Sequence, residues 1–403
     1  MLNVIDSGQA RRILEEHFGG KFSPQNERIG LTEAEGRILA EDVIADCDLP
    51  AFDRSTVDGY AVRAADTFGC SESLPSMLRF QGSVAMGERT SLVLDRDSCV
   101  YVPTGGEVPG GADAMVMLEY VQDYGDGFRY IEKSCAPGEN VIKKRDEAAC
   151  GDVVVEKGVK LSAGLIGSLA SMGYASVQVR RRPLIGIIST GDELVPITEK
   201  PEGATIRDVN TYTLAAQVTS AGGIPLIYGI VRDERELLYE KAAKAAGECD
   251  MLLISGGSSV GEKDSTAAVL ERICGKELLF HGLALKPGKP TICGDCGGKA
   301  LFGLPGHPLA SYFVFDRFVR PIVCEMSGEA RDAATLRAPL AFAVPSNHGR
   351  EEMIPVALEE GFAKPVYSKS GYITALARSD GYIVIPRDCE GRLRGEEVEV
   401  ILF

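Results

Sequence analysis

The sequence predicts a multidomain α/β protein in which a doubly wound, mostly parallel sheet is accompanied by β-rich domains. From residue 184 onward, apolar runs suited to buried strands alternate with helical patterns, which is typical of such a sheet. Residues 47–145 and 335–403 instead consist of short β-like runs broken by glycine and proline. The chain has 403 residues, of which 45% are hydrophobic, enough for roughly two to three domains with real cores.

The N-terminal third is predicted to form two domains. Residues 5–18 and 31–43 place apolar residues at helical spacing, and Thr32 with Glu35 fits a capping box, so we expect two helices there. Residues 152–180 suggest a strand, a helix from Ser162 and a second strand. We therefore predict a mixed connector domain from 1–46 and 146–182, and a β-rich lid domain, a small barrel or sandwich, from 47–145.

The remaining chain is predicted to hold the α/β domain and a small β domain. The expected strands of the sheet are residues 184–190, 224–231, 251–255 and 278–285, and a helix spans 308–326. The α/β domain is therefore assigned to 183–326. Short β-like runs assign 327–403 to a C-terminal β domain.

Composition excludes several classes of protein. A net charge of −15 argues against non-specific nucleic-acid binding, which needs basic surfaces.

The N-terminus lacks a secretory pattern, and the uncharged stretches 161–179 and 209–231 are interrupted by polar residues, so we expect no membrane span. Eleven scattered cysteines fit a reducing cytoplasm. The Cys293-Gly-Asp-Cys296 pattern favours a hairpin turn over a zinc or redox site.

Polar residues gather where the predicted parallel strands end, which is where ligands bind in such sheets. One strand ends in Thr190-Gly191-Asp192-Glu193, the next in Arg232-Asp233, and the third in Ser255-Gly256-Gly257-Ser258, with Asp264 following. The paired glycines allow backbone N–H groups to face a phosphate at the start of a helix. A purely structural glycine turn is an equally good interpretation.

The acidic residues at this edge suggest a metal. Glu193, Asp233 and Asp264 would repel one another unless a hard cation such as Mg²⁺ bridged them, although each alone is more often a solvated loop end or helix cap. Two lysines in a rigid loop, Lys286 and Lys289, could neutralise an anion. The turn Pro305-Gly306-His307-Pro308 leads into a helix, and its histidine is more often structural than catalytic.

The lid domain holds a second polar patch. Asp53 to Tyr60 and Pro103 to Gly106 place carboxylates, hydroxyls and glycine backbone on loops, although each could be merely a turn. The basic run Lys143-Lys144-Arg145 is by itself more often a solvated edge.

These motifs together resemble the MoeA/gephyrin family, the molybdopterin molybdenumtransferases of molybdenum cofactor synthesis. The resemblance rests on FDRSTVDGYAVR, PTGGEVPGGADAMVM, STGDELV, SGGSSVGEKD, LALKPGKP and GLPGHPLAS, which occur in the family's order and cover almost the entire chain. It implies a homodimer whose cleft lies between the molybdopterin-binding α/β domain of one subunit and the lid domain of the other. The implied reaction is metal-dependent and converts adenylylated molybdopterin and molybdate into molybdenum cofactor and AMP.

The resemblance also implies roles for individual residues. Asp58 and Thr104 would serve the pterin and molybdate side, while Glu193, Asp233 and Asp264 would hold Mg²⁺ and the nucleotide phosphate. The implied substrate-binding residues are Ser255, Gly256, Gly257, Ser258, Lys286, Lys289, Pro305 and Pro308, joined by Arg350 and Ser370 from the C-terminal domain and by Glu147. Further implied partners are the molybdopterin adenylyltransferase and cofactor-accepting enzymes.

The chain departs from the family pattern in three places. Arg145-Asp146-Glu147 stands where Gly-x-Asp is usual, Ser258 replaces a valine, and His307 replaces an asparagine. Two other functions compete with the implied one: the adenylyltransferase, which needs only the α/β domain, and a non-catalytic molybdopterin-binding scaffold. The sequence does not distinguish molybdate from tungstate.

Overall fold

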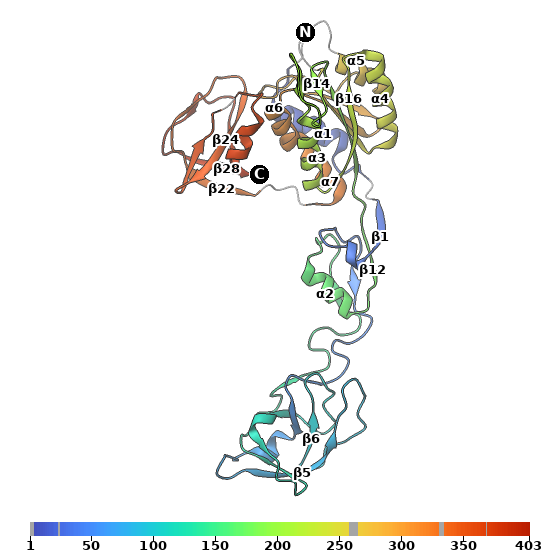
Figure 1. Cartoon of the computed structure of the whole chain (residues 1–403), viewed down its shortest axis with the longest axis vertical. Helices are drawn as coiled ribbons and strands as arrows, with labels where there is room; N and C mark the ends of the chain where they lie inside the picture. Colours follow the sequence, from blue (N-terminus) through green and yellow to red (C-terminus); the bar gives the residue numbers. More distant parts are fainter. Residues whose placement is uncertain (1–3, 23–24, 258–264, 330–333, 368) are drawn as a thin grey trace. The chain divides into compact units, whose positions relative to one another are not determined.

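The computed structural model describes residues 4–22, 25–257, 265–329, 334–367 and 369–403. The chain forms two compact units, one made of Met1–Glu27 with Val179–Phe403 and the other of Arg28–Gln178 (Figure 1). Within the described residues, no helix combines the length and the apolar character needed to cross a bilayer.

A six-stranded sheet forms the centre of the α/β domain. Its strand order is β16-β13-β17-β21-β20-β18. The first four strands run parallel: β16 (Ile224–Val231), β13 (Leu184–Thr190), β17 (Met251–Ser255) and β21 (Lys299–Leu304). Strand β20 (Ile292–Cys296) is antiparallel to β21, and β18 (Phe280–His281) is antiparallel to β20. The predicted mostly parallel sheet is therefore confirmed.

One predicted strand of this sheet is wrong. The apolar run 278–285 does not form a parallel strand but is divided between two sheets. Its first part gives the short antiparallel edge β18, and its end gives β19 (Leu285–Lys286), which pairs with the C-terminal domain. The fourth parallel strand is β21, which the sequence suggested only as one arm of a hairpin.

Helices cover both faces of the sheet (Figure 1). One face packs against α1 (Ser7–Phe18), α3 (Asn210–Ser220), α6 (Pro308–Val314), the π-helical segment η4 (Phe315–Val319) and α7 (Arg320–Ser327). The other packs against α4 (Arg235–Glu248) and α5 (Ser265–Cys274). Successive strand residues alternate between these two cores: Ile187 belongs to the first and Ile188 to the second.

The first helix lies in a different unit from the one the sequence suggested. Helix α1 buries Ala10, Leu14 and Phe18 in the core of the α/β domain, so residues 1–27 belong with that domain rather than with the connector. The helix begins with a capping box in which Asp6 accepts from Gln9 N, and the Gln9 side chain accepts from Asp6 N.

The second predicted N-terminal helix, residues 31–43, is wrong. Only one 3₁₀ turn forms there, η1 (Leu31–Glu33), and the segment ends in β2 (Val43–Ile44). Gly36 has a positive φ of 72°, which a helix does not allow, and its N–H donates to the carbonyl of Leu161. Tertiary backbone hydrogen bonds therefore override the helical apolar spacing.

The Arg28–Gln178 unit contains the predicted β-rich lid domain. Its sheet has the order β7-β4-β6-β5-β9-β8. These strands are β4 (Gly59–Val62), β5 (Ser76–Ser83), β6 (Ser98–Val102), β7 (Ala114–Met117), β8 (Val121–Gln122) and β9 (Phe128–Ile131). The smaller elements are β3 (Arg54–Ser55), β10 (Val141–Ile142), β11 (Val153–Val155), η2 (Ala64–Thr67) and η3 (Leu118–Tyr120). The predicted helix forms as α2 (Ala163–Ser171) with Ser162 as its N-cap, between β11 and β12 (Ser176–Arg180) in the chain. Strand β12 pairs with β1 (Asn26–Gly30).

The C-terminal domain is a small β domain, as expected. Its main sheet has the order β19-β24-β26-β28-β22, with β25 paired to β24. Its elements are β22 (Thr335–Pro339), β23 (Val344–Pro345), β24 (Glu351–Glu359), β25 (Phe362–Pro365), η5 (Ile373–Arg378), β26 (Gly381–Ile385), β27 (Gly391–Arg392) and β28 (Glu397–Leu402). Strand β19 belongs to the α/β segment, so one sheet joins the two domains.

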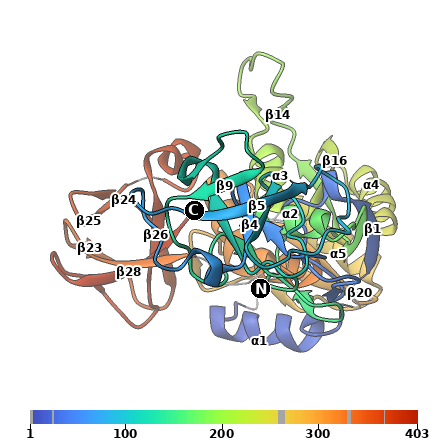
Figure 2. The ribbon, with the colours of Figure 1, turned by 90° about the horizontal axis from the view of Figure 1, so that it is seen from below.

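A narrow arm projects from the α/β domain. It contains β14 (Leu194–Val195) and β15 (Ile206–Arg207), which pair in parallel. Figure 2 shows the loop at β14 standing clear of the sheet and helices. Strand β14 follows directly from the Gly191-Asp192-Glu193 segment, so the arm begins at the edge where the polar residues gather.

The cysteine pattern forms the expected hairpin. Strands β20 and β21 are antiparallel, and Cys296 lies opposite Lys299 at the turn. All eleven cysteines lie in described segments and are free thiols. Burial raises the pKa of the Cys293 thiol well above its usual value, which disfavours thiolate chemistry there.

The central strand β13 sets the stability of the α/β domain. Ile187 is fully buried between the sheet and its helices, so Ile187→Ala should lower the free energy of unfolding of this domain by about 2–5 kcal/mol. Ile206→Ala on the exposed arm should cost about 0.5 kcal/mol or less. Urea unfolding of both variants measures the difference, and equal losses would contradict this account of the core.

Candidate functional site

A crevice lies at the carboxyl ends of β13 and β16, beside the end of β17, where the sequence predicted a ligand site; Asp192, Asp208 and Arg232 are among its lining residues. The Thr190 hydroxyl donates to Asp233 Oδ1 at 2.7 Å, and Asp233 N donates to Asp192 Oδ1 at 3.2 Å. Thr190 is buried, whereas Asp192, Glu193 and Asp233 are exposed. The segments after β13 and β16 are therefore tied together, and their carboxylates face solvent.

The glycine turn after β17 has no room for a side chain at its first position. Gly256 has a φ of 107°, and a Cβ there would lie 2.1 Å from the carbonyl oxygen of Thr190. The turn is anchored on both sides, since Gly256 N donates to Leu304 O at 3.1 Å and the Thr266 hydroxyl donates to Gly256 O at 3.0 Å. Gly257 follows with a φ of 61°. Gly256 is thus required for structure, and both its N–H and its carbonyl are used in anchoring the turn.

Asn210, at the start of α3, connects three parts of the crevice. Its amide Nδ2 donates to Ser255 Oγ at 2.7 Å and to the Gly306 carbonyl at 2.8 Å. Its Oδ1 is buried and has no hydrogen-bond partner within the described residues, and the same holds for Ser265 Oγ at the start of α5. Unsatisfied buried polar atoms are uncommon and often mark a bound ligand or water.

A buried network of polar side chains lies beside this crevice. Asp208 is almost fully buried; its Oδ1 accepts from Ser189 Oγ at 3.0 Å and its Oδ2 accepts from Thr211 Oγ1 at 2.6 Å. The sequence analysis missed both Asp208 and Asn210. The pattern Asp-Val-Asn ahead of a helix resembles an ordinary N-terminal cap, and only the tertiary contacts distinguish it.

The predicted metal ligands are placed only in part. Asp264 and Ser258 lie outside the described residues. In the segments that are described, no three His, Cys, Asp or Glu side chains are grouped as a metal site. Asp192, Glu193 and Asp233 nevertheless supply hard oxygen donors at one edge. Mg²⁺ commonly uses one or two protein carboxylates and completes its shell with phosphate and water, so this donor set fits it.

The lysine loop is partly neutralised by the C-terminal domain. Lys286 Nζ lies 2.8 Å from Glu352 Oε1, and Ser346 Oγ donates to the other oxygen of Glu352 at 2.7 Å. Lys289 is exposed and has no ion-pair partner in the described part of the chain. Lys289 is therefore the lysine whose charge is available to an anion.

The proline turn at 305–308 also contacts the C-terminal domain. Pro308 occupies the first turn of α6, as predicted. His307 Nδ1 lies 3.0 Å from Ser370 Oγ, and Leu309 N donates to Ser370 O at 3.0 Å. Pro305 is buried, whereas Arg350 is exposed at the start of β24. The histidine thus has a structural partner, which favours the structural interpretation.

The lid domain brings two of its predicted residues together. Thr104 N donates to Asp58 Oδ1 at 2.8 Å, and both residues are exposed. Gly105, with a φ of 83°, donates its N–H to Ser55 O at 2.8 Å and so fixes the loop that carries Thr104. Asp58 and Thr104 therefore form one cluster, in the unit 28–178.

The basic run near Glu147 is occupied by ion pairs. Lys143 pairs with Asp53 at 2.9 Å, and Lys144 and Arg145 pair with Asp48 at 3.1 and 2.9 Å. A hydrogen bond from Cys150 N and the pair with Arg145 lower the pKa of Asp48 to about 2. Glu147 pairs with Arg54 at 3.6 Å and is exposed. Structural pairing accounts for the basic run.

Family models match nearly the whole chain. The MoeA N-terminal region (domain I and II) matches residues 5–173, a probable molybdopterin binding domain matches 186–324, and the MoeA C-terminal region (domain IV) matches 337–403. A molybdopterin molybdenumtransferase of Bacillus subtilis is 35% identical over 94% of this chain and 90% of its own.

This chain belongs to the MoeA family. A solved MoeA structure from Pyrococcus horikoshii is 37% identical, covers 99% of both chains and has a TM-score of 0.86. A putative molybdopterin biosynthesis protein of Methanocaldococcus jannaschii is 34% identical over 100% of this chain and 98% of its own. The MoeA-family chain therefore has a role in molybdenum cofactor biosynthesis, as the sequence motifs implied.

The Gly256 turn gives a test of the crevice. Gly256→Ala should destabilise the MoeA-family chain by at least about 1 kcal/mol, because the new Cβ meets the Thr190 carbonyl in a backbone conformation that alanine disfavours. Gly247→Ala in α4, with open space around the new Cβ, should be neutral or stabilising. Thermal unfolding compares the two; an unaffected Gly256→Ala protein would mean that the strand ends are not held as described.

Proposed function

We propose that this protein inserts molybdate into adenylylated molybdopterin and releases AMP and molybdenum cofactor. The observation that carries this proposal is the Gly256-Gly257 turn at the end of β17, with unsatisfied Asn210 Oδ1 and Ser265 Oγ beside it. A turn of this kind offers backbone N–H groups to a phosphate. The family relationship supports the choice of a molybdopterin nucleotide as the occupant.

The nucleotide end of the substrate would be held by groups of the α/β domain. The backbone N–H of Gly257 would donate to a phosphate oxygen, since the N–H of Gly256 already donates to Leu304 O. The Asn210 Oδ1 would accept a hydrogen bond from a hydroxyl or amino group of the substrate. Lys289 would supply positive charge, because Lys286 is already paired with Glu352.

The carboxylates would hold Mg²⁺ against the phosphate. Asp233, which accepts from the Thr190 hydroxyl, and Glu193 follow strands that end at the same edge of the sheet, and Asp264 completes the set expected from the sequence. When bound, Mg²⁺ withdraws charge from the phosphate as the phosphoanhydride breaks. The chain's own contribution would be orientation: the Gly257 turn and Lys289 would bind the phosphate and so position it for the reaction.

The pterin and molybdate end would meet the Asp58–Thr104 cluster of a second subunit. This cluster lies in the unit 28–178, and the crevice lies in the other unit. We propose a homodimer in which each site combines the two from different subunits. Eleven free thiols support a cytoplasmic location.

Two other functions make different predictions. The adenylyltransferase would consume ATP and unadenylylated molybdopterin, and a scaffold would bind substrate without turnover. Purified protein with adenylylated molybdopterin and Mg²⁺ should release AMP only when molybdate is added. AMP release with no oxyanion dependence, or turnover of ATP, would overturn the proposal. Tungstate in a parallel reaction would measure selectivity between the oxyanions.

The charge of Asp233 should matter for chemistry more than for binding. Asp233→Asn keeps an oxygen that can accept from Thr190 but loses the charge. AMP release in a single turnover should slow by on the order of a hundredfold, a barrier increase of about 2.7 kcal/mol, while substrate is retained. Glu202→Gln, an exposed carboxylate on the arm, should be unaffected. An unchanged rate and Mg²⁺ dependence for Asp233→Asn would remove it from the mechanism.

Hybrid dimers test the shared site. Asp58→Ala and Asp233→Ala chains should each be inactive alone, because each lacks one side of every site. A mixed dimer contains one site free of both substitutions, so up to half of the activity per dimer should return. Native mass spectrometry verifies that hybrids formed, and verified hybrids without activity would place both groups in the same subunit's site.

A further inference from the structure

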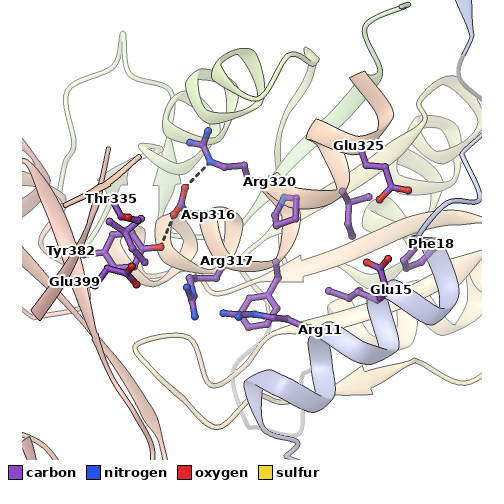
Figure 3. A pocket seen from close by; sticks show the side chains of 16 residues that line it. Arg11, Glu15, Phe18, Asp316, Arg317, Arg320, Glu325, Thr335, Tyr382 and Glu399 are labelled. Carbon is purple, nitrogen blue, oxygen red and sulfur yellow. Dashed lines mark hydrogen bonds and ion pairs between the residues drawn. The ribbon is translucent and has the colours of Figure 1, made fainter. Parts of the chain in front are cut away.

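A second cavity of about 610 Å³ lies away from the crevice. It is bounded by α1, η4, α7 and the strands β22, β26 and β28, all within one unit (Figure 3). None of its lining residues belongs to the set assigned to molybdate insertion. Its size falls in the range typical of small-molecule sites.

Two arginines lie side by side in this cavity (Figure 3). Arg317 lies in the π-helical segment η4, a distortion that is frequent at functional sites. Its Nη2 lies 3.2 Å from Glu351 Oε1, but its Nε is buried and has no partner in the described residues. Arg11 is exposed and lines the cavity. Among the residues that the structure describes, no carboxylate lies within ion-pair distance of its guanidinium group.

The carboxylates that line the cavity either accept hydrogen bonds from other groups or lie to either side of the two arginines. Asp316 accepts from Arg320 Nε and from the Tyr382 hydroxyl, both at 2.7 Å. Glu325 accepts from the backbone of Gly20. Figure 3 shows Glu399 beside Tyr382, and Glu15 with Glu325 toward the other end, with Arg11 and Arg317 between them.

The two arginines share the influence of one carboxylate, Glu351. Partial burial and the neighbouring Arg317 charge lower the pKa of Arg11, and Glu351 offsets this only in part. Two guanidinium groups at close range repel unless an anion bridges them, and a carboxylate matches their donor geometry. The wall beside them is apolar: Leu14, Phe318 and Ile322 line the cavity, and Arg11 lies over the Phe318 ring at 5.9 Å.

We propose that this cavity binds a small organic carboxylate with an apolar body. The carboxylate lies between Arg11 and the unpartnered Nε of Arg317, and the body lies against Leu14, Phe318 and Ile322. The site is separate from the crevice, so its ligand binds together with AMP rather than in competition with it.

The probe is 2-naphthoate, followed by fluorescence anisotropy. The chain has no tryptophan, so naphthyl emission is easily separated from that of the protein. The wild-type chain should bind 2-naphthoate saturably, and the uncharged isostere 2-naphthamide about tenfold more weakly or worse. Saturating AMP should leave 2-naphthoate binding unchanged.

Two matched variants locate the site. Arg11→Gln removes the guanidinium that has no ion-pair partner and should weaken 2-naphthoate binding about tenfold, equivalent to about 1.4 kcal/mol. Arg12→Gln, the exposed neighbour on α1 that does not line the cavity, should bind as the wild type does. Equal affinity of the two variants, equal binding of acid and amide, displacement by AMP, or no saturable binding at millimolar probe would each overturn the proposal.

Discussion

The close approach of Gly256 to the Thr190 carbonyl is the constraint on which the crevice depends. With no side chain at Gly256, the ends of β13 and β17 come within backbone contact. The same approach places the Thr190 hydroxyl against Asp233 and Ser255 against Asn210. A bulkier residue would separate all of these together, because they share two strand ends.

The predictable parts of the molecule are those governed by local pattern. The alternation of buried strands with helices predicted the parallel sheet. Because ligands bind at the carboxyl ends of such strands, the same pattern also predicted which polar residues lie at the ligand-binding edge. The helix predicted for residues 31–43 does not form, because Gly36 has a positive φ and the backbone around it is hydrogen-bonded to residues far away in the sequence. The single strand predicted for residues 278–285 does not form, because this apolar run contributes one short strand to each of two sheets.

The site could be predicted to the level of residue type but not of pairing. Sequence spacing placed Asp58 and Thr104 on loops, yet the hydrogen bond between them depends on how β3 and the Gly105 turn are registered. Lys286 and Lys289 look equivalent in sequence, and only the fold shows that Glu352 neutralises the first. Arg11 and Arg317 carry no shared motif, because the cavity between them exists only after α1 packs on the α/β domain.

The two-residue strand β19 joins the α/β domain to the sheet of the C-terminal domain. Leu285 and Lys286 pair with Glu351 and Glu352, so the loop bearing Lys289 begins inside the neighbouring domain's sheet. Shortening the chain after α7 would expose the edge of β19 and release Lys286 from its counter-ion. The loop that carries Lys286 and Lys289 is therefore held partly by the C-terminal domain, through the pairing of β19 with β24 and the ion pair of Lys286 with Glu352.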